Sequence, residues 1–135
     1  MANEGVLSRT KISGEKAATD DHPVIIHALP LDENVIKQLP PGLIMERTAA
    51  GAYRLYDPGN GLTCAVLDDA GAPTGDVIPA KPCLAVVNEP CDPETETSAK
   101  CVVHGCVKTR LLQTGEDPAN AGALEALADC GIFAV

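Results

Sequence analysis

Short apolar runs separated by turn residues dominate the chain from Gly42 onward. The runs LIMER and AYRLY, joined by residues 48–51, predict a β-hairpin in which Gly51 takes a positive φ. Gly105 interrupts the longest apolar run and indicates a bulge or a close approach of another backbone segment. The other runs also predict strands, so that strands are expected at 24–26, 62–67, 83–88, 100–112 and 132–135, with loops at 57–61, 68–75 and 92–99.

A brief helix is expected after the first of these strands. Asp32 is a suitable N-cap, and Val35, Ile36 and Leu39 follow at a spacing that places them on one buried side. The two prolines at 40 and 41 end this segment.

A second helix is better marked and lies near the C-terminus. Asp117 is predicted as its N-cap and Pro118 as its first residue. Leu124, Leu127 and Ala128 form an apolar stripe at helical spacing, and Gly131 provides the left-handed C-terminal cap.

These elements predict an α+β fold that is mostly β, with one C-terminal helix, in a single compact domain over residues 20–135. Residues 1–19 are expected to form an extended arm that is mobile in isolation, because they have little apolar periodicity and carry a net charge of +1. Within the arm, residues 6–12 are best suited to an extended strand, although a flexible terminus without regular structure fits the same residues. One face of that strand would carry Leu7, Arg9 and Lys11, and the other Val6, Ser8, Thr10 and Ile12.

Composition narrows the possible functions. The chain has 135 residues, a size for one domain, and a net charge of −9, which repels nucleic-acid phosphates. Aromatic residues make up 2% of the chain and offer almost no surface on which bases could stack, so no nucleic-acid partner is expected. No apolar run approaches the length of a membrane span, and the start MANEGVLSRTK is polar, unlike a signal peptide. Synthesis in the cytoplasm is therefore expected, with the six cysteines kept as thiols.

The best candidate for chemistry is the segment CVVHGC, which contains Cys101, His104 and Cys106. A small metal- or thiol-dependent enzyme centred on these residues is the alternative function. Zinc needs four ligands and no CxxC pair supplies the others, while a nucleophilic Cys106–His104 pair has no identifiable orienting carboxylate. His22 and His27 have no ligand partner nearby, and prolines interrupt the acidic segment 89–96 as a calcium loop. We therefore expect neither enzymatic activity nor a metal or other cofactor.

Four segments, read in order, resemble the lambda-type phage head decoration proteins, which cement the outside of icosahedral capsids. They are a hairpin with a Tyr/Pro turn, an apolar strand before an acidic loop, a valine-rich strand, and a closing helix with a Gly-Ile-apolar end. In this chain they correspond to residues 41–58, 83–88, 101–107 and 123–135. Cys83 stands where the family usually has glycine, and the segment 20–40 is longer than in the family.

The resemblance implies a structural virion protein on the outer capsid surface, synthesised in the host cytoplasm. It implies a homotrimer at the three-fold sites of the expanded shell, where the N-terminal arm adds a strand to the major capsid protein. Strand addition relies on backbone hydrogen bonds, so a weak side-chain pattern over Val6–Ile12 is compatible with that role.

Overall fold

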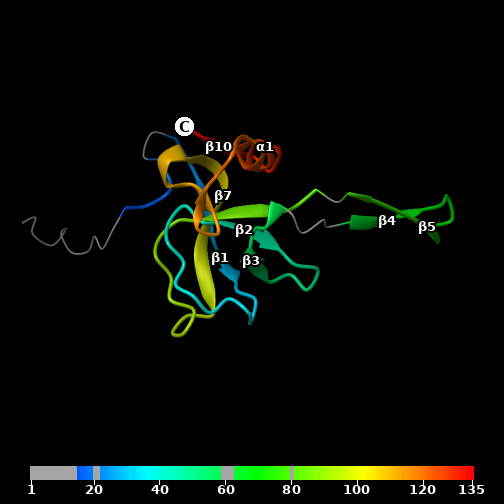
Figure 1. The fold of residues 1–135 in the computed structure, drawn as a ribbon, viewed down its shortest axis with the longest axis horizontal. Coiled ribbons are helices and arrows are strands. Elements are labelled where there is room, and N and C mark those ends of the chain that lie inside the picture. Colours follow the sequence, from blue (N-terminus) through cyan, green and yellow to red (C-terminus); the bar gives the residue numbers. More distant parts are fainter. Residues whose placement is uncertain (1–14, 20–21, 59–62, 80) are drawn as a thin grey trace, which may run out of the picture.

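The computed structural model of the chain describes residues 15–19, 22–58, 63–79 and 81–135 (Figure 1). Strands account for 43% of the residues and helices for 12%, which confirms the mostly β fold with one C-terminal helix. The elements are β1 (Ile25–Pro30), β2 (Ile44–Arg47), β3 (Tyr53–Leu55), β4 (Thr63–Leu67), β5 (Pro73–Pro79), β6 (Leu84–Val87), β7 (Ser98–Val107), the 3-10 helix η3 (Thr109–Leu111), β8 (Gln113–Thr114), β9 (Asp117–Pro118), α1 (Ala121–Asp129) and β10 (Ile132–Ala134).

A six-stranded sheet forms the body, in the order β1-β7-β6-β2-β3, with β10 paired in parallel to the end of β7. The predicted hairpin is confirmed: β2 and β3 pair antiparallel, with Arg47 opposite Tyr53, and Gly51 in their turn has a φ of 92°. Leu31, directly after β1, forms a parallel bridge with Tyr53. The chain leaving one edge strand therefore meets the other edge strand, and the sheet curves around a core.

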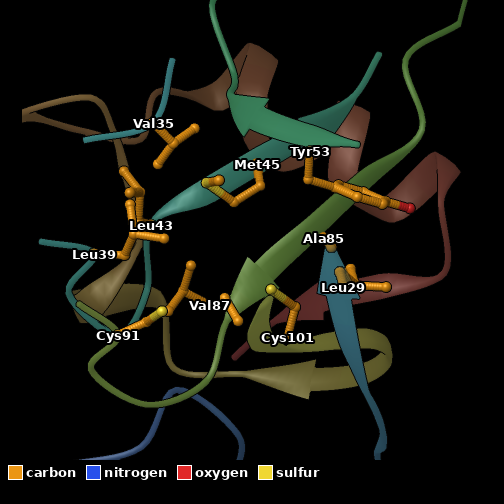
Figure 2. Packing of buried hydrophobic residues seen from close by; sticks show 11 residues of the cluster. Leu29, Val35, Leu39, Leu43, Met45, Tyr53, Ala85, Val87, Cys91 and Cys101 are labelled. Carbon is orange, nitrogen blue, oxygen red and sulfur yellow. The ribbon is translucent and has the colours of Figure 1, made fainter. Parts of the chain in front are cut away.

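Both faces of this sheet are buried at its centre, because all four residues of the apolar strand β6 are buried. One face carries the first cluster, whose side chains point toward one another in Figure 2. The first cluster consists of Leu29, Val35, Leu39, Leu43, Met45, Tyr53, Ala85, Val87, Cys91, Ala99 and Cys101. Alternate residues of β6 and β2 point to the opposite face, where Val86 and Ile44 enter a second cluster.

Helix α1 covers the second cluster. Ala123 and Leu127, four residues apart, are buried against Ile44, Val86 and Ile132. Burying a leucine side chain stabilises a fold by about 1.5–3 kcal/mol, so the helix is held mainly by this apolar contact.

The start of this helix differs from the prediction. Asn120 is the N-cap, and its side-chain oxygen accepts a hydrogen bond from the N–H of Ala123 at 2.9 Å. Asp117 and Pro118 instead form β9, which pairs with β8. An Asn is as good an N-cap as an Asp, and the pairing with β8 holds residues 117–118 extended. At the other end Gly131 has a φ of 85°, as expected for a left-handed cap.

No helix forms over residues 32–39 of the described chain, so that prediction is wrong. The Asp32 carboxylate accepts the backbone N–H two residues ahead and makes a single turn. Further along, Leu39 exchanges two backbone hydrogen bonds with Cys91, which keeps the chain extended. Val35 and Leu39 are buried as expected, but Ile36 is 72% exposed.

The close approach of residues 23–24 to strand β7 explains why residue 105 is a glycine. Its φ is 122°, and a Cβ there would lie 2.7 Å from Cγ1 of Val24 and 2.9 Å from the carbonyl oxygen of Pro23. The register of β1 against β7 also shifts between Ile25 and Ile26. Of the two expected alternatives, the close approach is therefore present at Gly105, while the register shift lies between His104 and Val102. Strand β7 ends at Val107 and gives way to η3 instead of reaching residue 112.

Strands β4 and β5 form a separate two-stranded sheet, the ribbon (residues 63–79), which Figure 1 shows extending away from the six-stranded sheet. The strand predicted at 62–67 is confirmed as β4, but β5 was expected to be partly loop. The turn is shorter than expected, because the Asp68 carboxylate accepts the N–H groups of Ala70 and Ala72 and closes it by residue 72.

Candidate functional site

The residues predicted to bind a capsid, Val6–Ile12, lie outside the described residues. The structure describes the place where this segment joins the domain, beginning at Glu15. There Ala17 is fully buried in the second cluster. Residues 15–19 therefore pack on the domain, although they fall within the predicted arm.

Backbone hydrogen bonds hold this attachment point. The N–H of Ala17 donates to the carbonyl of Asn88 at 3.0 Å, and the N–H of Lys108 donates to the carbonyl of Ala17 at 2.9 Å. The buried Asn88 side chain adds a further bond by accepting the N–H of Ala18 at 3.0 Å. The segment thus lies between the end of β6 and the end of β7, where it is bonded to Asn88 and to Lys108 respectively.

Glu15 adds charge pairing at the surface. Its carboxylate contacts the Lys108 ammonium at 3.1 Å and both terminal nitrogens of the Arg110 guanidinium, one of them at 2.9 Å. A two-pronged Arg–carboxylate contact fixes orientation well. Because all three side chains are accessible to water, the contribution to stability is small, and we interpret the pairing as positioning the start of the segment.

The residues of the alternative enzyme lie in different surroundings. Cys101 is fully buried in the first cluster, where burial and the neighbouring Cys91 raise its pKa to about 12. His104 is exposed, and its ring lies against Gly131, where an added Cβ would come within 2.6 Å of Nδ1. Cys106 is half-buried on the far side of Gly105, opposite Phe133 of β10. A thiolate is the reactive form of cysteine, so the environment of Cys101 opposes activation of that thiol. Cys106, the thiol of the predicted Cys106–His104 pair, is only half-buried.

Metal binding finds no support in the same region. Within the described ranges no group of three or more His, Cys, Asp or Glu side chains could hold a metal ion.

Five cysteines of the described chain are free thiols, of which Cys91 and Cys101 are buried and Cys83 is exposed. Tyr53 contacts the sulfur of Cys83 at 3.8 Å, and burial raises the pKa of this tyrosine to about 12.

Glu46 is a buried carboxylate that the sequence did not single out. Its Oε1 accepts the backbone N–H of Asp57 at 3.0 Å, and its Oε2 lies 3.5 Å from the Arg54 guanidinium on the neighbouring strand β3. Glu46 thereby ties the segment after β3, which leads toward the ribbon, to the middle of the sheet. The sequence contained one signal for this role: the charged pair Glu46 and Arg47 stands in the short apolar run that forms β2.

The ribbon exposes apolar side chains that a folded domain usually covers. Leu67 is 56% exposed and Val77 is 63% exposed. A second exposed apolar set lies on β1, where Ile25 is 49% and Ile26 is 40% exposed. The predicted strands at 24–26 and 62–67 carry Ile25, Ile26 and Leu67, whereas the turn-like residues of β5 concealed the strand that carries Val77. The exposure of these side chains was not predicted, because it depends on which strands pair in three dimensions.

Among the described helices none is both long enough and apolar enough to cross a membrane. Comparison of the chain with protein-family models, with curated proteins and with solved structures finds no match.

Proposed function

We propose that this protein is a structural, non-enzymatic virion protein that binds the outer surface of an expanded phage capsid. It is synthesised in the host cytoplasm and acts as a homotrimer at three-fold sites. Its N-terminal arm adds a strand to the major capsid protein, and the bound trimer stabilises the shell.

One observation carries the proposal. The four segments that resemble the decoration proteins supply β2 with β3, β6, most of β7, and α1 with β10. These elements are direct neighbours: β6 lies between β2 and β7, and β10 pairs with β7. Segments chosen for their order along the sequence thus share one sheet and one helix-covered core, as expected if the resemblance reflects a common fold.

The attachment of the N-terminal segment supports the arm mechanism. The hydrogen bonds of Ala17 and the charge pairing of Glu15 fix the position on the domain of Glu15, the first described residue after the predicted strand segment. An arm with a fixed origin samples less space, so it loses less entropy on binding than one joined through a free linker. Three such arms in a trimer multiply the attachment points and raise the avidity for the shell.

Charge and thiol environment agree with a binding role. The net charge of −9 keeps particles apart in solution. Burial of Cys101 with its raised pKa disfavours a reactive thiolate at one of the three residues on which the alternative enzyme is centred.

The test compares two double variants within the arm. Ser8→Pro/Thr10→Pro removes two backbone N–H donors that a strand addition needs, whereas Ser8→Ala/Thr10→Ala keeps both. Each purified variant is sedimented with expanded heads, and the heads are then heated to find the temperature at which they break. We expect the proline variant to lose occupancy and protection, and the alanine variant to retain both.

Three results would contradict the proposal. Full occupancy of the proline variant would remove strand addition by the arm. Failure of the unaltered protein to bind heads would remove the capsid role as a whole, and turnover of a substrate by the purified protein would favour the enzyme.

A further inference from the structure

The ribbon lacks the contacts that a free-standing hairpin needs. Strand β4 pairs with β5, and neither joins another strand of the described chain. An isolated two-stranded hairpin is at best marginally stable in water, and a third strand or a packed face is required. With Leu67 and Val77 both more than half exposed, the ribbon has an apolar surface and two open edges for such a partner.

Strand β1 has apolar side chains that are exposed to solvent and an edge that could accept another strand. Its four residues from Ile25 to Ala28 are all exposed, although β7 pairs with them along one side. Within the part of the chain that the structure describes, the other side is paired only beyond the end of the strand, by the bridge from Leu31 to Tyr53. An exposed apolar edge strand is a template for a strand from another chain.

We propose that the ribbon of one copy of this chain pairs with the open edge of β1 in a second copy. The two edges would exchange backbone hydrogen bonds, and Leu67 or Val77 would cover Ile26. Such a head-to-tail contact uses two different surfaces, so it can repeat around a rotation axis until the ring closes. The contact rests on the proposed function, because it would form the interface between the copies of the proposed trimer. It does not require a capsid, so it can be examined on the purified protein alone.

Charge favours the ribbon as the occupant of this edge. The ribbon contains Asp68, Asp69 and Asp76 and no Lys or Arg. Residues 22–30, which include β1, contain no carboxylate, and the exposed Lys100 lies opposite Ala28 on β7. Lys100 is 3.6 Å from Glu89, but its side chain remains largely in water and accessible to an acidic strand. The predicted arm has the opposite sign, with a net charge of +1 over residues 1–19, and so fits this edge less well.

Three single substitutions test the contact through the mass of the protein in solution, measured by light scattering without capsids. Val77→Asp alters the ribbon, Ile26→Asp alters the edge of β1, and Ile36→Asp is the matched control at another exposed residue. We expect the first two to weaken self-association by about tenfold or more, because each puts a charge where a branched apolar side chain would be buried. The control should associate like the unaltered protein. Far-ultraviolet circular dichroism checks that each variant is folded.

A crosslinking experiment identifies the partner surface. Purified Val77→Cys protein is mixed with Ile26→Cys protein under mild oxidant, and the disulfide-linked peptides are identified by mass spectrometry, which separates them from links made by the native cysteines. We expect a peptide that joins position 77 of one copy to position 26 of the other. Ile36→Cys in place of Ile26→Cys provides the control and should give no such link.

The inference is overturned if the unaltered protein has the mass of one chain, or if Val77→Asp or Ile26→Asp leaves the oligomer intact. A link from position 77 to position 36 as strong as that to position 26 would also overturn it. If the protein is a single chain in solution and Val77→Asp loses binding to heads, the ribbon contacts the shell instead. An oligomer that depends on the ribbon but does not bind heads would support this inference while contradicting the proposed function.

Discussion

Replacement of Glu46 tests how strongly one buried carboxylate holds the end of the β2–β3 hairpin. The side chain is almost fully buried, and Oε1 accepts the Asp57 N–H at 3.0 Å. Glu46→Ala removes this acceptor and leaves the N–H of Asp57 without that bond.

The expected loss can be estimated from three contributions. A hydrogen bond to a charged acceptor contributes about 1.5–3 kcal/mol. The contact with Arg54 at 3.5 Å adds less than about 1 kcal/mol, because the guanidinium is partly exposed and water screens the pair. The cavity left by the missing side-chain carbons costs about 1 kcal/mol. We therefore expect Glu46→Ala to lower the free energy of unfolding by about 3–4 kcal/mol, a large part of the roughly 5–15 kcal/mol typical of a domain.

The assay is equilibrium unfolding in urea at pH 7, followed by far-ultraviolet circular dichroism. Glu46→Gln keeps an oxygen for the Asp57 N–H, so a loss of about 1–1.5 kcal/mol is expected from the missing charge. Arg54→Ala should cost less than about 1 kcal/mol. The reasoning is refuted if Glu46→Gln is as destabilising as Glu46→Ala, or if Arg54→Ala is the most damaging of the three.

Three further predictions use the same unfolding measurement. Leu127→Ala, which empties a fully buried site under α1, should lower the free energy of unfolding by about 2–5 kcal/mol, and a loss below 1 kcal/mol would contradict the packing described. Gly105→Ala should cost about 2–4 kcal/mol, because the positive φ is strained for alanine and the new Cβ meets the backbone of Val24; an unchanged midpoint would argue against this close approach. Burial raises the pKa of Cys101 from 9.0 to about 12, so the unfolded chain releases this proton at lower pH than the native protein does. The contribution of this thiol to the free energy of unfolding is therefore fully present below pH 9 and is lost as the pH rises toward 12. Cys101→Ala should reduce the loss of stability measured between pH 8 and pH 10.5.

The elements that sequence patterns predicted well are those whose signal is local. Gly51 between two apolar runs defined the β2–β3 hairpin, and Gly131 after a helical stripe defined the end of α1. The helix assigned to residues 32–39 was wrong, and the start of α1 was placed at Asp117 instead of Asn120, in both cases because a local signal has several outcomes. Asp32 caps a single turn as readily as a helix, and partners distant in the sequence, such as Cys91 for Leu39, decided between them.

The surfaces proposed to act were harder to predict. Strand β5 contains proline and glycine, which usually mark loops, and its pairing with β4 became visible only in three dimensions. The role of Asn88 depends on Ala17 and Ala18, which are far from it in the chain. Conversely, the arm residues Val6–Ile12 were selected from the sequence and from the resemblance, and they lie outside the described residues, so their role stays a prediction.

The position of the ribbon in the topology makes it a replaceable module. Both β3 and β6 pair with β2, so they lie about 10 Å apart on either side of it. Residues 56–62 and 80–83 are enough chain to cross that distance without the ribbon. One deletion could therefore remove residues 63–79, and one insertion could lengthen them or substitute a foreign peptide, while every strand of the six-stranded sheet keeps its neighbours. Natural variation and protein engineering can thus alter the reach of this molecule independently of its core.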